Sequence, residues 1–324
     1  MIITKTPYRI SLFGGGTDMP KWYKKNRGAV VSFAVDKYCY IVLRDLPIFS
    51  EHAFKVTYSL IETVNQVSDI HHPAFREAIK KYAPISRLEI NHLGDLPARS
   101  GIGSSSTFAV GLINALNLWS GKSLTSEKLA NLAIEFEQKD LLENVGSQDQ
   151  IACATGGLNL IEFGPEDRWQ VTPLNVSNDY RKKIESWIVL AYSGITRYSS
   201  DISKHLIENL EKHNILLNRT AELAYICNDI FRSEGDLYQI GTLLNESWEI
   251  KKILNPYTST EALNSLISKA KDLGAIGSKV LGAGGGGFCL FWVDPKNRNH
   301  FVENMNSLKI IPIAISDEGT TQIK

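Results

Sequence analysis

The stretch Pro97-Ala-Arg-Ser-Gly-Ile-Gly-Ser-Ser-Ser106 carries most of the information in this chain of 324 residues. Gly101 and Gly103 can adopt positive φ angles and let the backbone approach a ligand closely. The serines that follow open an apolar helical pattern, and the N-terminus of a helix offers backbone N–H groups without partners. The segment therefore predicts a cradle for an anion, and a nucleotide phosphate is the expected occupant.

Two better-known phosphate motifs can be tested on the same chain. A P-loop needs a glycine five positions before its Gly-Lys-Ser triplet and a strand leading in, but Gly121-Lys-Ser123 has Leu116 at that position and follows the helix-like run 108–119. The segment 281–288 contains the pattern G-x-G-x-x-G, which binds dinucleotides only where it opens a helix. The run 288–293 that follows is strand-like. We therefore reject both motifs.

Two further segments complete the pattern, Arg9-Ile-Ser-Leu-Phe-Gly-Gly-Gly-Thr-Asp18 and Gly146-Ser-Gln-Asp-Gln150. In this order, with the loop at 97–106 and the glycine run at 281–288, the four segments resemble the GHMP kinase superfamily of galacto-, homoserine, mevalonate and phosphomevalonate kinases. Within it they look most like the bacterial sugar kinases that act on D-glycero-D-manno-heptose 7-phosphate. The resemblance covers nearly the whole chain.

Departures from the family pattern are mild. Ile102 stands where Leu is usual, Ser106 where Ala is frequent and Arg99 where a small residue is common. Of the three, only Arg99 could alter the chemistry, because it brings a charge into the loop.

Composition limits the partners and the compartment. Lys plus Arg and Asp plus Glu are each 35, so there is no net basic field to recruit nucleic acid or an anionic membrane. No apolar run approaches the ~20 residues of a membrane helix, and no secretory leader pattern is seen. We expect a cytoplasmic protein whose partner is a small-molecule sugar or sugar phosphate; a homodimer stays open. The four cysteines are widely spaced and are expected to be buried thiols.

Strands and helices alternate irregularly, which favours an α+β layered fold over a doubly wound sheet. Strands are expected at 8–13, 29–43, 87–92, 158–163, 169–174, 187–192, 280–293 and 310–315, with helices at 108–119, 126–142 and within 197–274. A linker near 175–179 is the best boundary candidate. The resemblance implies an N-terminal domain like ribosomal protein S5 domain 2 (residues 1–178) and a ferredoxin-like C-terminal domain (residues 179–324), with the active site between them.

The resemblance also implies roles for single residues. Asp149 aligns with the catalytic base, and Arg9 with an arginine near the transferring phosphate. Glu137 and Ser105 align with the ligands of Mg²⁺, although Glu135 and Glu143 compete with Glu137. The expected nucleotide-binding residues are Pro97, Gly101, Gly103, Ser104, Ser105 and Ser106, and the expected acceptor-binding residues are Gly15, Gly16, Thr17, Asp18, Arg197, Gly284, Gly285 and Gly286.

Without the resemblance, each of these residues has an ordinary structural interpretation. Asp149 and Ser105 could cap helices, Asp18 could close an Asx-turn, and Glu137 could lie on a solvated helix face. The basic residues Lys21, Arg99, Arg197 and Lys279 could each meet a second phosphate or simply be solvated.

The expected function is ATP- and Mg²⁺-dependent phosphorylation of a sugar, most of all at the anomeric hydroxyl of D-glycero-D-manno-heptose 7-phosphate. Two alternatives stay open, a kinase for galactose or fucose and a relative that binds sugar and nucleotide without turnover.

Overall fold

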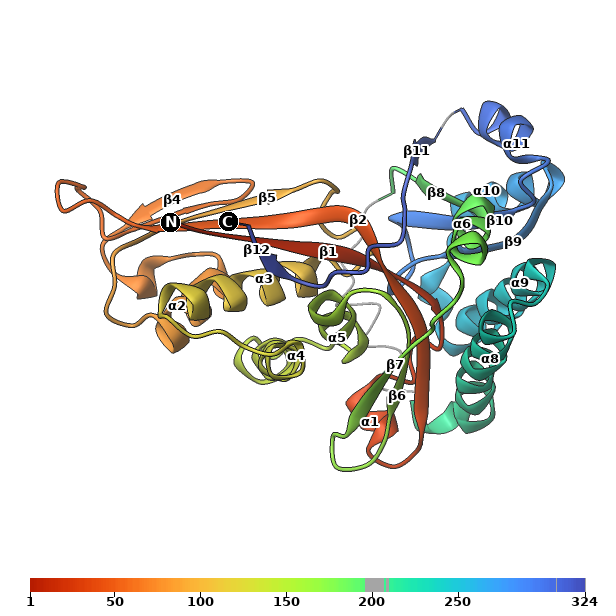
Figure 1. Ribbon diagram of the computed structural model, residues 1–324, viewed down its shortest axis with the longest axis horizontal. Coiled ribbons are helices and arrows are strands. Elements are labelled where there is room, and N and C mark those ends of the chain that lie inside the picture. The colour runs from red at the N-terminus through yellow and green to blue at the C-terminus, as the bar shows by residue number, and fades with distance from the viewer. Residues whose placement is uncertain (196–206, 208–209, 307, 324) are drawn as a thin grey trace.

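The computed structural model describes residues 1–195, 207, 210–306 and 308–323, which form two sheets flanked by helices (Figure 1). The larger sheet has the strand order β12-β1-β2-β5-β3-β4, and β6 and β7 extend it from β2. Its strands are β1 (Ile2–Phe13), β2 (Gly28–Asp45), β3 (Phe54–Thr57), β4 (Ile61–Val64), β5 (Leu88–Gly94), β6 (Leu158–Phe163), β7 (Trp169–Pro173) and β12 (Thr321–Gln322).

Strand β2 holds this sheet together because it is long enough to pair with three other strands. Its first half pairs with β6, its second half with β5, and β1 runs antiparallel along most of its length. Strand β1 is almost wholly buried, as its β-branched and aromatic residues predict.

Helices cover one face of the larger sheet (Figure 1). The apolar helix α3 (Ser104–Trp119) packs on β1 and β2. The other helices of this half are α1 (Pro20–Tyr23), α2 (Pro73–Tyr82), α4 (Ser126–Glu135) and α5 (Gln148–Thr155), with the 3₁₀ turn η1 (Val67–Asp69). The helix expected over 126–142 changes character at Phe136, where a π-helical turn, η2 (Phe136–Asp140), follows α4. Such turns are frequent at functional sites because they shift the helical register.

The smaller sheet is antiparallel throughout, in the order β11-β8-β10-β9. Its strands are β8 (Ile188–Tyr192), β9 (Ala275–Val280), β10 (Phe288–Val293) and β11 (Lys309–Ile311). Around it lie α6 (Asn178–Trp187), α9 (Leu237–Leu254), α10 (Glu261–Asp272) and α11 (Arg298–Asn304), with the short turn η4 (Pro256–Thr258). Helix α8 (Asn214–Arg232), which follows the turn η3 (Leu210–His213), packs on α9 and on β1 and β2 of the larger sheet. The expected α+β layering is confirmed.

Two details differ from the sequence-based expectation. The run 280–293 is not one strand, since β9 and β10 are separated by a glycine loop. The linker expected at 175–179 is shorter than predicted, because α6 already begins at Asn178. The chain then returns to the larger sheet, where Gln322 pairs with Thr4 (Figure 1). The domain boundary at residue 178 stays a prediction.

The described residues contain no helix with the length and apolarity to cross a membrane. All four cysteines are free and buried, as expected.

A buried lysine ties the two sheets together. The Nζ of Lys279, in β9, donates to the carbonyl oxygens of Leu12 at 2.9 Å and Ser11 at 3.3 Å, both in β1. Lys279 is 6% exposed. The idea that it is a surface charge is therefore wrong; its ammonium is committed to holding β9 against β1.

Burial, and next the charge of Arg9, lower the pKa of Lys279 from 10.5 to about 8. The unfolded chain therefore keeps this proton to higher pH than the folded chain. The cost of burying the charge is fully present below pH 8 and falls as the pH rises toward 10.5.

Lys279→Met removes the buried ammonium group. Above pH 8 we expect the free energy of unfolding of the wild type to rise relative to that of the variant, by roughly 1 kcal/mol per pH unit. Urea unfolding of both proteins between pH 7 and 10 measures this difference, and parallel pH curves would contradict it.

Candidate active site

The loop 97–106 is built by left-handed glycines. Gly101 has φ +85°, and Gly103, with φ +73°, is the N-cap of α3. The hydroxyl of Ser100 donates to the carbonyl oxygen of Pro97 at 2.6 Å, and Ser104 Oγ accepts the N–H of Arg99 at 3.1 Å. These contacts close the loop on itself and present the first N–H groups of α3 outward, as an anion site at a helix N-terminus requires.

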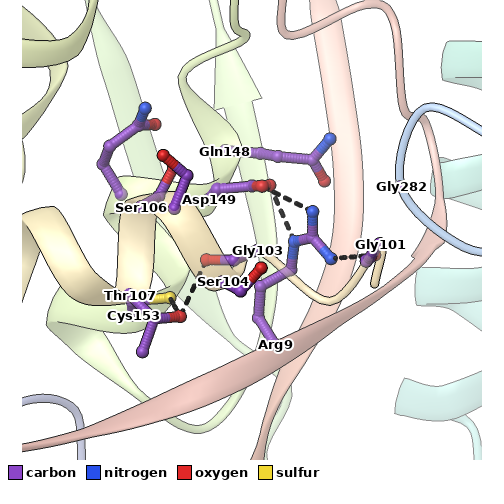
Figure 2. Close-up of polar contacts among 12 residues, drawn as sticks. Arg9, Gly101, Gly103, Ser104, Ser106, Thr107, Gln148, Asp149, Cys153 and Gly282 are labelled. Carbon is purple, nitrogen blue, oxygen red and sulfur yellow. Dashed lines mark hydrogen bonds and ion pairs between the residues drawn. The ribbon is translucent and has the colours of Figure 1, made fainter. Parts of the chain in front are cut away.

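The glycine loop between β9 and β10 lies directly against this phosphate loop. A Cβ on Gly101 would lie 2.6 Å from the carbonyl oxygen of Leu281, and one on Gly282 would lie 2.5 Å from the Cα of Gly101. A Cβ on Gly287 would lie 2.3 Å from the carbonyl oxygen of Ser100. Backbone therefore meets backbone here, and Figure 2 shows the loop of Gly282 close to Gly101.

The other glycines of that loop pack on neighbouring segments. Gly285 N donates to the carbonyl oxygen of Thr258 at 2.6 Å, and a Cβ on Gly284 would lie 2.7 Å from Thr258. A Cβ on Gly286 would lie 2.4 Å from the carbonyl oxygen of Ile195. Contact of these three glycines with an acceptor stays a prediction.

Arg9 and Asp149 form the central ion pair of the site (Figure 2). Arg9 Nε donates to Asp149 Oδ1 at 2.7 Å and Nη2 to Oδ2 at 2.5 Å, while Nη1 donates to the carbonyl oxygen of Gly101 at 2.9 Å. The side chain of Arg9 is 4% exposed and that of Asp149 is 23% exposed. Gly103 makes room for the pair, because a Cβ there would lie 3.3 Å from Asp149 Oδ2. One guanidinium thus joins the phosphate loop to an accessible carboxylate.

Asp18 holds the first glycine segment against α5. Its Oδ1 accepts the N–H of Gly16 at 2.8 Å and its Oδ2 that of Gln148 at 3.3 Å. A Cβ on Gly146 would lie 1.8 Å from Oδ2. Burial, and next the charge of Asp149, raise the pKa of Asp18. Asp18 is 2% exposed, so its first role is to latch the loop, and contact with a sugar stays a prediction.

Thr17 also supports the loop, since its hydroxyl donates to the carbonyl oxygen of Gly14 at 2.8 Å. Arg197 lies outside the described residues, so its predicted role is untested.

Glu137 points from the π turn toward the start of α3. Its Oε1 accepts a hydrogen bond from the Ser105 hydroxyl at 3.0 Å. Its Oε2 accepts hydrogen bonds from the Ser106 hydroxyl at 2.7 Å and from the Gln150 amide at 2.5 Å. Glu137 is fully buried. Burial raises its pKa to about 7, against the opposing effect of the hydrogen bond from Ser106. Glu135 instead lies beside Lys81, which favours Glu137 as the carboxylate of the site.

Glu137 and Ser105 fit a magnesium site of the usual kind, in which one or two protein oxygens join phosphate oxygens and water. The 3.0 Å between Ser105 Oγ and Glu137 Oε1 suits two neighbouring ligands of an octahedral ion, which stand about 2.9 Å apart when each bond is about 2.05 Å. Ser105 is exposed at the phosphate loop, whereas Glu137 lies behind it. Among the described residues no three His, Cys, Asp or Glu side chains gather as a metal cluster.

Sequence reasoning missed three contributors. Gln150 donates to Glu137, and Lys251 Nζ donates to the carbonyl oxygens of Val280 and Gly282 at 2.9 and 2.6 Å, which holds the glycine loop. The third contributor is Gln148, whose backbone N–H donates to Asp18 Oδ2. Ser106 was expected to contact the nucleotide, but its hydroxyl is turned to Glu137 and it is 3% exposed. Proximity of Gln148 and Gln150 to Asp149 in the sequence was the available signal.

Comparison with known proteins can now be set beside this geometry. Residues 69–157 match the GHMP kinases N terminal domain and residues 224–309 the GHMP kinases C terminal domain. The D-glycero-alpha-D-manno-heptose 7-phosphate kinase of Campylobacter jejuni is 33% identical over 316 residues, which cover 93% of this chain and 92% of that protein. This chain belongs to the GHMP kinase family. It is a phosphotransferase that acts on a hydroxyl acceptor, a sugar kinase.

Solved structures of this family share the fold. A D-glycero-D-manno-heptose 1-phosphate kinase from Bacteroides thetaiotaomicron superposes with a TM-score of 0.81 at 24% identity, covering 100% of this chain and 99% of that one. The galactokinase of Lactococcus lactis, solved with galactose, gives a TM-score of 0.76 at 18% identity and covers 99% of this chain and 95% of that one. The expected two-domain GHMP kinase fold is confirmed.

Removing the carboxylate of Asp149 tests its assignment as the base. We expect Asp149→Asn to lower kcat by ~10²–10⁴, the usual cost of losing general-base catalysis, while nucleotide affinity changes little. Steady-state kinetics and calorimetry with ADP measure the two effects. Asp272→Asn, on an exposed helix end, is the control. Activity within tenfold of the wild type would show that Asp149 is not the base.

Ser105→Ala and Glu137→Gln test the metal site. Each should raise the Mg²⁺ concentration needed for half-maximal rate, and the double variant should be less impaired than the product of the two single effects, because both residues serve one cation. Magnesium titrations of all four proteins measure this coupling. Independent losses with unchanged Mg²⁺ dependence would contradict a shared site.

Proposed function

We propose that this sugar kinase transfers the γ-phosphoryl group of ATP to the anomeric hydroxyl of D-glycero-D-manno-heptose 7-phosphate in a Mg²⁺-dependent reaction. The observation that carries the proposal is the 33% identity to the Campylobacter jejuni heptose 7-phosphate kinase over nearly the full length of both chains. The arrangement of the phosphate loop, Arg9 and Asp149 supports it, because phosphoryl transfer needs positioning, charge neutralisation and a proton acceptor.

In this proposal the nucleotide phosphates lie at the N-terminus of α3, and the acceptor lies at Asp149 on the other side of Gly103. Asp149 accepts the proton of the attacking hydroxyl; its 23% exposure leaves room for that contact beside Arg9. Arg9 orients the carboxylate through two hydrogen bonds and brings its charge next to the transferring group. Bound Mg²⁺ supplies neutralisation of phosphate charge, and Glu137 and Ser105 would hold it.

A kinase for galactose or fucose is the second candidate. The L-fucokinase/L-fucose-1-P guanylyltransferase of Bacteroides fragilis is 26% identical over 365 residues, covering 97% of this chain and 38% of that protein. The third alternative, a relative that binds without turnover, is disfavoured because Asp149, Glu137 and Ser105 are all present and joined as described. A cytoplasmic location and a homodimer stay predictions.

The two sugar-kinase candidates differ in whether the acceptor already carries a phosphate. Arg99 is exposed beside the phosphate loop, and Lys21 is exposed beside the first glycine segment, where its Nζ donates to the carbonyl oxygen of Ile207 at 3.0 Å. Lys279 is excluded from this group by its bonds to β1. Of the four basic residues considered from the sequence, Arg99 and Lys21 are thus the described ones that stay candidates for contact with a distal phosphate.

A panel of acceptors tests the proposal. Charge-assisted hydrogen bonds contribute ~1.5–3 kcal/mol each, so two contacts to the distal phosphate should favour the phosphorylated heptose over the free heptose by ~10²–10⁴ in kcat/KM. The measurement compares D-glycero-D-manno-heptose 7-phosphate, the unphosphorylated heptose, galactose and fucose. Equal or better use of a free sugar would refute the proposal, and repetition with Arg99→Ala, Lys21→Ala and Arg197→Ala locates the phosphate contact.

A further inference from the structure

Helix α9 lies along the outer edge of the smaller sheet. The strand at that edge is β9, which within the described part of the chain pairs with β10 alone. The carbonyl and N–H groups on its other side therefore have no strand partner. Such groups need hydrogen-bond partners when they are covered. In this protein α9 packs on β9, so side chains of α9 have to supply those partners.

Glycines let the helix and the strand approach closely. A Cβ on Gly277 would lie 2.1 Å from the carbonyl oxygen of Gly241, and a Cβ on Gly241 would lie 2.6 Å from the side chain of Ile276. The backbone of α9 thus rests directly on β9 at this point. Residues further along α9 are thereby held at a fixed distance from the strand edge.

Asn245 supplies partners to the first part of the strand edge. Its Nδ2 donates to the carbonyl oxygen of Ile276 at 2.8 Å, and its Oδ1 accepts the N–H of Ser278 at 3.1 Å. Both backbone groups lie on the side of β9 away from β10, because residues on an antiparallel strand alternate between the two sides in their hydrogen bonds. Asn245 therefore stands in for a neighbouring strand.

Lys251 supplies partners at the other end of the same edge. Its Nζ donates to the carbonyl oxygen of Val280 at 2.9 Å and to that of Gly282 at 2.6 Å. Val280 is the last residue of β9, so the second of these bonds lies beyond the strand. Four of the five residues that follow Gly282 are glycines with positive φ, and such a backbone has little preference of its own for one path. Lys251 thus fixes the start of a loop that its own sequence leaves free.

The residue that Lys251 holds is also the one that meets the phosphate loop. A Cβ on Gly282 would lie 2.5 Å from the Cα of Gly101, so the two backbones are already in contact. At the other end of the glycine loop, the N–H of Phe288 donates to the carbonyl oxygen of Ser100 at 2.8 Å. The phosphate loop therefore rests on the glycine loop at two points, and a shift of the glycine loop displaces both.

We propose that Lys251 is a positioning residue for nucleotide binding. It holds Gly282 against Gly101, and in this way keeps the phosphate loop in the shape that receives the nucleotide phosphates. Lys251 acts through backbone contacts and does not touch the nucleotide. It belongs to none of the four motifs in the sequence, so it is a contribution of the smaller sheet's outer helix to the site. The inference rests on the proposed use of ATP, and the experiments separate the two.

Lys251→Met tests the proposal, because it removes both hydrogen bonds and keeps most of the volume of the side chain. We expect the Kd for ADP to rise roughly tenfold, the size of effect that one or two hydrogen bonds produce, and kcat/KM for ATP to fall by a similar factor. The matched control is Asn245→Ala, which also removes two hydrogen bonds to the edge of β9 but at the end away from the glycine loop. Its Kd for ADP should stay within about twofold of the wild type.

Calorimetry with ADP and thermal melting of the three proteins distinguish positioning from simple stabilisation. A purely structural role would lower the melting temperature of both variants and leave their affinity for ADP unchanged. An unchanged Kd in Lys251→Met, or an equal rise of Kd in both variants, would overturn the proposal.

Hydrogen exchange tests the link between the two loops in the wild type itself. Coupling between two sites is reciprocal, so ADP should slow exchange in peptides covering 281–290 as well as 97–106. Protection of 97–106 alone would overturn the proposal. Without nucleotide, Lys251→Met should exchange faster than the wild type in both peptides, and Asn245→Ala should match the wild type there. If the wild type does not bind ADP, the proposed use of ATP fails, while this comparison of the free proteins still tests Lys251.

Discussion

Direct backbone contact between the phosphate loop and the glycine loop of the smaller sheet is the constraint on which the site depends. Gly101, Gly282 and Gly287 each lie where a Cβ would come within 2.6 Å of an atom of the opposite loop. Helix α3 begins one residue after Gly103, and β10 begins one residue after Gly287. Any side chain at the contact would therefore displace either the helix whose N-terminus faces the phosphates or a central strand of the smaller sheet.

Buried charged side chains then fix the positions of the groups that the close approach of the two glycine loops brings together. Arg9 spans from Gly101 to Asp149, so the acidic group keeps a fixed place relative to the phosphate loop. Lys279 fastens β9 to the strand that carries Arg9, and its lowered pKa reflects both its burial and the nearness of that arginine. Glu137 differs, because its hydrogen-bond donors are all neutral and burial raises its pKa to about 7. A divalent cation is the kind of partner that such a carboxylate suits.

Local sequence predicted the regular elements well where hydrophobic periodicity is strong. The strand expected at 158–163 is β6, and the helix expected at 108–119 is α3, which starts earlier, at the serines of the phosphate loop. Prediction failed where local pattern and tertiary contact disagree. Residues 280–293 look like one apolar strand, yet five glycines with positive φ break the run. The path of that loop is decided by Ser100, Ile195 and Thr258, none of which is close in sequence.

Sequence by itself determined the family, because four glycine- and acid-bearing motifs occur in a fixed order, and it pointed to Arg9, Asp149 and Glu137 as the residues of interest. Only the tertiary structure decided what each side chain does. It showed Asp18 as the latch of its own loop, Lys279 as a tie between sheets, and a π turn that directs Glu137 to Ser105. The reason is physical: motif spacing follows from the chain, but a hydrogen bond between Arg9 and Asp149 joins residues 140 positions apart and exists only once α5 has packed on β1.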